Sequence, residues 1–229
     1  MREVTTHKEI DANGGQGSVD RRTADGAGRR ELLASQTGET VTVYQAYSPA
    51  IAEPALRAGT FVEPFRVGRM TWVKPSFLWM MYRCGWATKP DQERVLAVEI
   101  GRDDLLWALA RACLSSFEPG PHADEQSWRA ALAAAPVRVQ WDPDRDLQLR
   151  PTGRRAIQIG LGPEASRRYV SSWIRSIRDV TPLAHEIHAR VQADDLAGAR
   201  ALLPDERPLP LPPEIAHRLG ASLTGRGSA

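Results

Sequence analysis

Cysteine and lysine are scarce in this chain, and long apolar runs are absent. Its 229 residues include two cysteines, Cys84 and Cys113, which do not form a C-x-x-C pair. This excludes a disulfide framework and a cysteine-rich zinc site, and it predicts two reduced thiols. The first residues, MREVTTHKEIDANGG, lack the apolar region of a signal peptide, and no stretch approaches the roughly 18 apolar residues of a membrane helix. We therefore expect a soluble, cytoplasmic protein that does not contact a membrane.

Several motifs with known chemistry are also missing. There is no G-x-S-x-G nucleophile elbow, no Walker loop and no complete dinucleotide fingerprint, because the segment around Gly160 and Gly162 lacks a third glycine. The HEIH segment separates His185 and His188 by three positions, which is not the H-E-x-x-H spacing of a zinc helix. We expect no metal, and we expect both histidines to be structural or surface residues.

Positive charge is concentrated in two parts of the chain. The formal net charge is only +2, yet residues 66–102 and residues 150–178 each contain more basic than acidic side chains. These two segments either converge into one anion-binding surface or form solvated faces of unrelated helices. The sequence leaves both arrangements open.

Both ends of the chain have compositions typical of tails. Residues 1–38 are rich in Gly, Thr, Asp and Arg and contain few large apolar side chains, which predicts a flexible N-terminal tail. Residues 205–229 are Pro-rich and then Gly/Ser-rich, which predicts an extended C-terminal tail. The globular domain is expected over residues 39–204.

Strands and helices alternate irregularly between these tails. Alternating apolar residues predict strands over residues 40–48, 94–100, 136–142 and 155–161. Helical spacing predicts helices over residues 49–56, 76–84, 103–115, 124–135 and 164–177, with two more starting near residues 181 and 194. This order favours a single α+β domain, with a mixed sheet and packed helices, over a doubly wound parallel sheet.

The segment MTWVKPSFLWMMYRCGW, residues 70–86, contains three of the seven tryptophans and three of the four methionines. Pro75 and Gly85 bracket a helix that is apolar on every side, so this helix should run through the middle of the fold. Lys74 precedes the helix and Arg83 lies in its last turn. A charge near the core is costly unless it is paired or faces an anionic ligand. Lys74, one of only three lysines, either contacts a phosphate or carbonyl group or extends into solvent.

Five segments of the chain resemble a known family. They are QAYSPAIA (45–52), RMTWVKPSFLWMMYRCGWATK (69–89), RVQWDPDRD (138–146), RAIQIGL (155–161) and the YVSSWI stretch with the DVTPLA that follows it. They are similar to the bacterial and fungal family catalogued as domain of unknown function 4291, over roughly residues 40–213. Because that family is defined without an activity, the resemblance implies no catalytic residue.

Polar side chains stand beside the apolar strands. The candidate ligand-binding residues are Tyr44, Gln45, Tyr47, Arg69, Trp72, Lys74, Tyr82, Arg83 and Gln158. Arg and Lys can hold a pyrophosphate, Gln can orient a ribose or a base edge, and an aromatic ring can stack on a base. Together they predict a site for a phosphate-bearing, nucleotide-like ligand.

This inventory is similar in kind to that of the ADP-ribosyltransferase fold, which binds NAD without a glycine fingerprint. On that analogy NAD is the cofactor, Gln45 and Tyr47 contact the ribose and nicotinamide, and Gln140 or Asp142 is the catalytic residue near the reacting sugar. Arg69 and Lys74 would hold the pyrophosphate, and Tyr82 would stack. The sequence departs from this analogy, because it offers no convincing strand-borne catalytic Glu and Gln140 or Asp142 would have to take that role.

A second function is compatible with the sequence. The Arg-rich segment 150–178 could follow a phosphate backbone, which would make the protein a non-catalytic nucleic-acid-binding or protein-interaction module. The small net charge favours a focused anion site over an extended basic track. We therefore rank the small-molecule site first.

Overall fold

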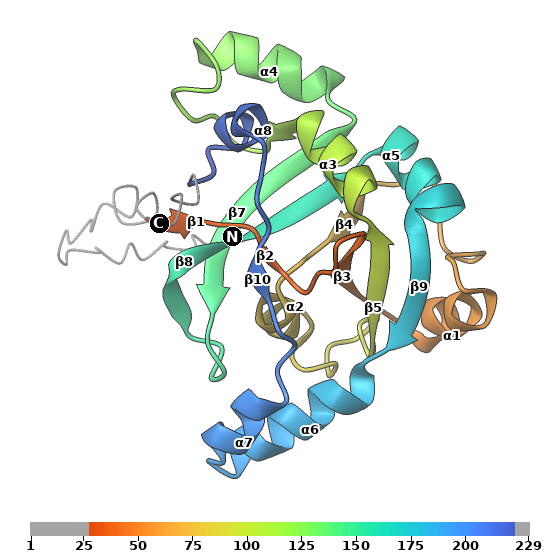
Figure 1. The fold of residues 1–229 in the computed structure, drawn as a ribbon. Helices are drawn as coiled ribbons and strands as arrows, with labels where there is room; N and C mark the ends of the chain where they lie inside the picture. Colours follow the sequence, from red (N-terminus) through yellow and green to blue (C-terminus); the bar gives the residue numbers. More distant parts are fainter. Residues whose placement is uncertain (1–27, 223–229) are drawn as a thin grey trace, which may run out of the picture.

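The computed structural model describes residues 28–222, so most of the predicted N-terminal tail lies outside the described residues. Within that range the chain forms an α+β domain with a curled, mixed five-stranded sheet, a three-stranded antiparallel sheet, a two-stranded pair and eight α-helices (Figure 1). The predicted α+β class with packed helices is therefore confirmed. Among the described residues, no helix has the length and apolar character needed to cross a membrane.

The larger sheet is built around β8 (Pro151–Leu161). Its other strands are β7 (Val137–Arg145) and β4 (Thr71–Val73), both antiparallel to β8, β1 (Arg29–Arg30), parallel to β8, and β6 (Ala112–Leu114), parallel to β7. On β7, Val137, Val139 and Trp141 are buried while Arg138 and Gln140 face outward, as the alternation predicts.

The smaller sheet consists of β3 (Thr40–Tyr47), β5 (Arg94–Gly101) and β9 (Ile174–Asp179), with antiparallel pairing throughout. A single bridge links it to the larger sheet. The backbone N–H of Tyr44 donates to the carbonyl of Lys74 at 2.7 Å, and the N–H of Lys74 donates back at 3.2 Å. The short segment from Thr71 to Lys74 therefore joins both sheets, and this fixes the backbone of Lys74.

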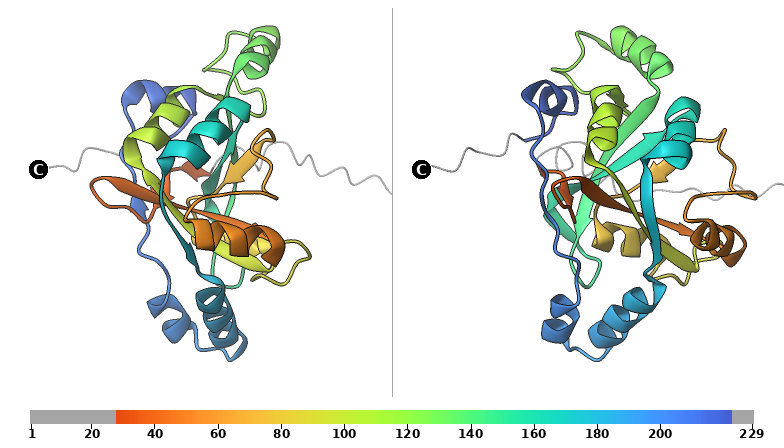
Figure 2. Two further views of the ribbon diagram at one scale, coloured as in Figure 1. Left: turned by 90° about the vertical axis from the view of Figure 1, so that its right-hand side faces the viewer. Right: turned by 45° about the vertical axis from the view of Figure 1, so that its right-hand side comes forward.

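The helices cover the sheets and both ends of the domain. They are α1 (Pro49–Ala58), α2 (Phe77–Cys84), α3 (Arg102–Ala110), α4 (Glu125–Ala134), α5 (Pro163–Arg168), α6 (Thr181–Gln192), α7 (Leu196–Ala201) and α8 (Pro213–Arg218). In both views of Figure 2, α4 lies at one end of the molecule and α6 and α7 lie at the other. Helix α2 packs against β3 and β7, and Phe77, Met80 and Met81 join a core that includes Ala184 and Ile187 of α6.

Two predicted helices end early and are replaced by strands. The helix predicted over residues 103–115 ends at Ala110, and residues 112–114 form β6 beside β7. The helix predicted over residues 164–177 gives way to a π-helical turn at Tyr169–Trp173 and then to β9. In both cases β-branched or apolar residues meet the open edge of a neighbouring strand, and that pairing overrides helical spacing.

The predicted domain boundaries at residues 39 and 204 differ from the fold, because both neighbouring segments add to it. β2 (Leu33–Ala34) pairs with β10 (Arg207–Pro208), and Leu209 and Leu219 are buried in the main core. The indole N–H of Trp141 donates to the carbonyl of Leu219 at 2.8 Å. Each segment has too few apolar residues to fold alone. The two segments are ordered because they pair with each other and pack on the domain.

Candidate functional site

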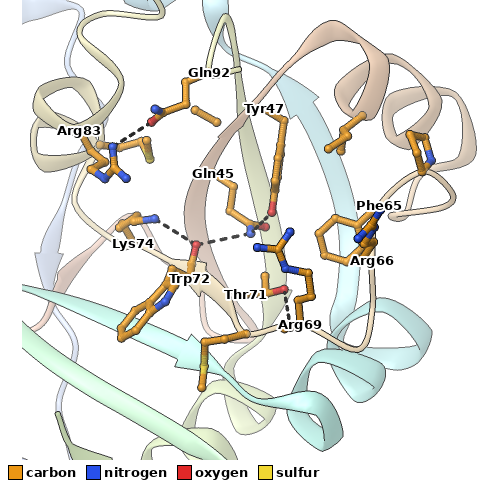
Figure 3. A pocket seen from close by; sticks show the side chains of 15 residues that line it. Gln45, Tyr47, Phe65, Arg66, Arg69, Thr71, Trp72, Lys74, Arg83 and Gln92 are labelled. Carbon is orange, nitrogen blue, oxygen red and sulfur yellow. Dashed lines mark hydrogen bonds between the residues drawn. The ribbon is translucent and has the colours of Figure 1, made fainter. Parts of the chain in front are cut away.

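A pocket of about 670 Å³ lies beside β4, bordered by the end of β3, by the loop between α1 and β4, and by α2 (Figure 3). Four cationic side chains line it: Arg66 and Arg69 from the loop, Lys74 after β4, and Arg83 from α2. No carboxylate is found among the described residues of this lining. Like charges around one cavity repel one another, so the lining favours an anionic ligand.

Lys74 is the most buried of these cations, with 8% of its surface exposed. Its Nζ donates to the carbonyl oxygen of Trp72 at 3.2 Å and lies 5.9 Å from the centre of the Trp79 ring. Burial, reinforced by the positive charge of Arg83, lowers the pKa of Lys74 to about 8, while the charge of Asp142 acts in the opposite direction. The ammonium therefore lacks a carboxylate partner among the described residues and has a cavity in front of it.

Gln45 is fixed at the back of the pocket, where 2% of its surface is exposed. Its Oε1 accepts a hydrogen bond from the Tyr169 hydroxyl at 2.7 Å, and its Nε2 donates to the Tyr47 hydroxyl at 2.7 Å. Burial raises the pKa of both tyrosines, so both hydroxyls keep their protons. Because Tyr47 accepts from Gln45 and has no acceptor among the described residues, its own proton can be donated to a ligand.

The three arginines of the lining keep most of their donors free. The guanidinium groups of Arg66 and Arg69 are exposed and make no ion pair or hydrogen bond with the described residues. Arg83 donates only to Oε1 of Gln92, at 3.4 Å. Guanidinium N–H groups bind phosphate and carboxylate oxygens in pairs. The sequence analysis missed Arg66, because an exposed arginine in an irregular loop carries no pattern.

Aromatic rings supply apolar walls. Tyr47 packs edge-on against Phe65, with ring centres 5.9 Å apart, and both residues line the pocket. Trp72 lines the opposite side, and its ring covers Gly160, where a Cβ atom would lie 3.0 Å from the indole. A side chain at position 160 would displace the indole, so Gly160 is needed for this wall. Flat or sugar-like groups fit such walls.

The structure does not bring Gln140, Asp142 and Gln158 into the pocket lining. Gln140 and Gln158 face each other on β7 and β8, and both donate to the carboxylate of Asp142, Gln140 at 2.9 Å to Oδ1 and Gln158 to Oδ2. Each Asp142 oxygen thus already has a donor. The predicted catalytic role of Gln140 or Asp142 near a reacting sugar has no direct geometric support. The charge of Asp142 nevertheless raises the pKa of Lys74 slightly.

Tyr44 and Tyr82 also lie outside the lining. Tyr44 is 2% exposed and packs edge-on against Phe77, with ring centres 5.4 Å apart. Tyr82 is 41% exposed, and the guanidinium of Arg145 lies 3.6 Å from its ring centre. The prediction that this helix is apolar on every side is therefore wrong, because α2 turns Tyr82 and Arg83 toward solvent or the pocket. Tyr82 is occupied by a cation and does not stack on a ligand in this pocket.

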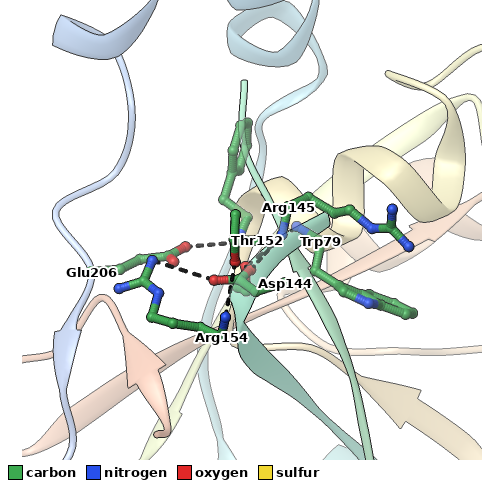
Figure 4. Close-up of polar contacts among 8 residues, drawn as sticks. Trp79, Asp144, Arg145, Thr152, Arg154 and Glu206 are labelled. Atoms are coloured by element: carbon green, nitrogen blue, oxygen red, sulfur yellow. Dashed lines mark hydrogen bonds and ion pairs between the residues drawn. The ribbon is translucent and has the colours of Figure 1, made fainter. Parts of the chain in front are cut away.

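A buried acidic cluster, not expected from the sequence, fixes the start of α2 (Figure 4). The carboxylate of Glu206 accepts from the backbone N–H of Phe77 at 2.6 Å. Asp144 accepts from the Ser76 hydroxyl at 3.4 Å and pairs with Arg154 at 3.3 Å. Burial raises the pKa of Glu206 to about 8, and the negative charge of Asp144 adds to this effect. The cluster thus binds backbone N–H groups in the first turn of α2 that have no partner within the helix. This turn begins shortly after Lys74.

The two basic segments do not converge in this pocket. No arginine of residues 150–178 lines it, and five of the seven pair with described carboxylates. These five are Arg150, Arg154, Arg168, Arg175 and Arg178. Paired arginines present less free positive charge to a phosphate backbone than the sequence alone indicates.

Metal-ligand geometry is absent in the part of the chain that the structure describes. No group of three or more His, Cys, Asp or Glu residues is placed to hold an ion there. His188 instead stacks on Trp86, with ring centres 5.2 Å apart.

A family model matches residues 31–209, most of the chain and nearly all of the described fold. The chain therefore belongs to the family named domain of unknown function (DUF4291). No curated protein matches it. The match begins before the predicted domain boundary and ends after it, in agreement with the strands β2 and β10.

Proposed function

We propose that this protein binds a phosphate-bearing, nucleotide-like small molecule in the pocket beside β4. The observation that carries the proposal is the set of four cations around one cavity without a described carboxylate. Arg66 and Arg69 need not break an ion pair with a described residue to reach a phosphate. Arginine holds phosphate oxygens through paired N–H donors, and lysine contributes a compact charge.

The remaining groups of the lining fit the non-phosphate part of such a ligand. The hydroxyl proton of Tyr47 is available to a ribose or base oxygen, and it is oriented by the buried amide of Gln45. Phe65 and Trp72 offer ring faces or edges on opposite walls. Aromatic contacts with a nucleobase are worth about 1–3 kcal/mol each and tolerate different bases.

NAD belongs to this ligand class, and an NAD-dependent transferase similar to the ADP-ribosyltransferases is the finer form of the proposal. Its support is the combination of pyrophosphate-binding cations with a Gln and Tyr pair. The transfer step needs a group that stabilises positive charge on the sugar, and Asp142 would have to approach from β7. The binding proposal stands without that step.

A nucleic-acid-binding or protein-interaction module that uses residues 150–178 ranks second. The five ion pairs in that segment reduce its free positive charge. Binding to single-stranded and duplex nucleic acid, measured across salt concentrations, tests this alternative, because each neutralised phosphate steepens the salt dependence. We expect no measurable slope.

Thermal unfolding in the presence of NAD, ATP, GTP and pyrophosphate tests the pocket. A ligand at 100 times its Kd should stabilise the fold by about 2.7 kcal/mol. The double variant Arg66→Gln/Arg69→Gln should lose this response without losing stability, since both side chains are exposed. Arg129→Gln is the matched control, because Arg129 is an exposed arginine on α4 that does not line the pocket. A response that survives the double variant, or no response to any ligand, would refute the proposal.

A further inference from the structure

We propose that the amine of Lys74 forms an imine with a phosphate-bearing aldehyde or ketone that enters this pocket. The inference rests on the proposed function, since the arginines would hold the phosphate of the ligand. It adds a covalent step at Lys74, the one lysine among the described residues of the lining, and narrows the ligand to compounds that carry both groups, such as a sugar phosphate with a free carbonyl.

The surroundings of Lys74 suit a nucleophilic amine better than a structural cation. Its Nζ opens on the pocket and has one hydrogen-bond acceptor, the carbonyl of Trp72 at 3.2 Å. A structural ammonium that is buried to this degree is normally paired with a carboxylate. Desolvation and a neighbouring cation are the two means by which enzymes keep a lysine amine reactive, and Arg83 supplies the second.

The fraction of free amine follows from the lowered pKa. With a pKa of about 8, about one Lys74 side chain in ten is unprotonated at pH 7. An ordinary lysine is unprotonated in about one molecule in three thousand. Because only the unprotonated amine attacks a carbonyl, the pocket raises the reactive fraction about 300-fold.

The charged groups around Lys74 come from several elements. Burial and the positive charge of Arg83 on α2 lower the pKa of Lys74. Cys84 and Asp142 of β7 raise it, but by less than burial lowers it. Figure 3 shows Arg66 and Arg69 on one side of Gln45 and Lys74 on the other. A phosphate held at the arginine side leaves the carbonyl end of a small ligand toward Lys74. The phosphate charge then lies away from the amine and disturbs it less.

The covalent step balances without a further reactant. The amine nitrogen of Lys74 adds to the carbonyl carbon, and the carbonyl C–O bond breaks as the C=N bond forms. The oxygen departs as water with the two protons of the amine, so no group is oxidised or reduced. Tyr47 lines the same cavity, and its hydroxyl proton can hydrogen-bond to the carbonyl oxygen during the addition.

The scarcity of lysine makes the proposal easy to test. Lys89 is exposed, and its Nζ donates to the carbonyls of Tyr82 and Arg83 at 3.2 and 2.9 Å. It is therefore an internal comparison on the C-terminal side of the same helix. The third lysine, Lys8, lies outside the described residues.

The experiment treats the full-length chain with pyridoxal 5′-phosphate, an aldehyde that carries a phosphate, and reduces the imine with borohydride before peptide mapping. We expect label at Lys74 to exceed label at Lys89 by about tenfold or more, because the pocket raises the reactive fraction of the Lys74 amine and its arginines hold the phosphate of the reagent. Lys74→Arg, which keeps the positive charge, should remove this label, and Lys89→Arg should leave it unchanged. Labelling should rise through about pH 8, where half of the Lys74 amine is unprotonated, and level off at higher pH.

Three outcomes separate this inference from the proposed function. Equal labelling of Lys74 and Lys89 would overturn the imine. Phosphate ligands that shift the unfolding temperature without any label at Lys74 would overturn the imine and leave the proposed function intact. Pyridoxal that labels Lys74 as fast as its phosphate ester, with no thermal response to phosphate ligands, would overturn both the phosphate requirement and the proposed function.

Discussion

Replacement of Lys74 by methionine should stabilise the fold at neutral pH and abolish the response to phosphate ligands. The pKa of Lys74 falls from 10.5 to about 8 on folding, and one pKa unit corresponds to 1.36 kcal/mol. Burial of the ammonium therefore destabilises the fold by about 3 kcal/mol at pH 7. Methionine has a similar length and no charge, so the variant avoids this cost.

Loss of one hydrogen bond offsets part of that gain. The carbonyl of Trp72 loses the donor Lys74 but keeps Nε2 of Gln45 at 3.5 Å. A lost hydrogen bond costs about 1 kcal/mol, which leaves a net stabilisation of about 2 kcal/mol at pH 7.

The pH dependence gives the sharper test. Below about pH 8 both the folded and the unfolded lysine are protonated, so the whole cost is present. Between pH 8 and 10.5 the folded lysine loses its proton first and the cost disappears. The advantage of Lys74→Met should therefore be largest at pH 7 and vanish toward pH 10.5.

Urea unfolding of both proteins at pH 7, 8, 9 and 10 measures this difference directly. Lys89→Met is the control, because the exposed Lys89 ammonium contacts the last carbonyls of α2 and the Tyr82 ring, and the interaction with the helix end is worth about 0.3–1 kcal/mol. If Lys74→Met is destabilised at pH 7 by as much as at pH 10, the ammonium is well solvated or paired and the reasoning is refuted.

Three further predictions concern the walls and supports of the pocket. Gly160→Ala should displace the Trp72 indole, lower the free energy of unfolding by about 1–3 kcal/mol and weaken ligand binding in the thermal assay. Gly153→Ala on the same strand is the control, because its Cβ meets no atom within 4 Å and should change neither stability nor binding. Because the pKa of Glu206 is raised to about 8, the free energy of unfolding of the wild type should fall relative to that of Glu206→Gln as the pH rises from 5 to 8. Urea unfolding that gives both proteins the same pH dependence would contradict this. Leu219→Ala should lower the free energy of unfolding by about 2–5 kcal/mol in urea, and a change below 1 kcal/mol would mean that the C-terminal segment is not part of the core.

The parts of the fold that could be predicted are those with a local period. Strand β3 and helix α2 follow from alternation and from the bracketing Pro75 and Gly85, and the Ser76 side chain caps α2 by accepting the Trp79 N–H at 3.3 Å. Strand β4 has three residues and no period, so no pattern could indicate it. Its formation depends on pairing with β8, which lies far along the chain. A pattern within a short stretch of sequence does not predict pairing between such distant segments.

The site was predicted in part for a similar reason. Lys74 and Arg83 were identified because a charge beside an apolar helix is unusual, and the structure places both on one cavity. Gln140 and Asp142 lie on the partly apolar strand β7, but their contacts are with each other and with Gln158. Which face of a sheet meets a cavity depends on tertiary packing, and the sequence pattern distinguishes only the buried face from the other one.

The location of the pocket follows from the junction of the two sheets. Residues after β4 bond to β3 through Tyr44, and α2 must start at once because Glu206 and Ser76 satisfy its first N–H groups. The backbone of Lys74 is held between these two constraints, and 8% of the residue's surface is exposed. Its neighbours offer a carbonyl and rings, which leave an ammonium undercompensated. The electrostatic cost of this fold is therefore largest at the Lys74 ammonium, and the anion or carbonyl compound that we propose as the ligand would reduce that cost.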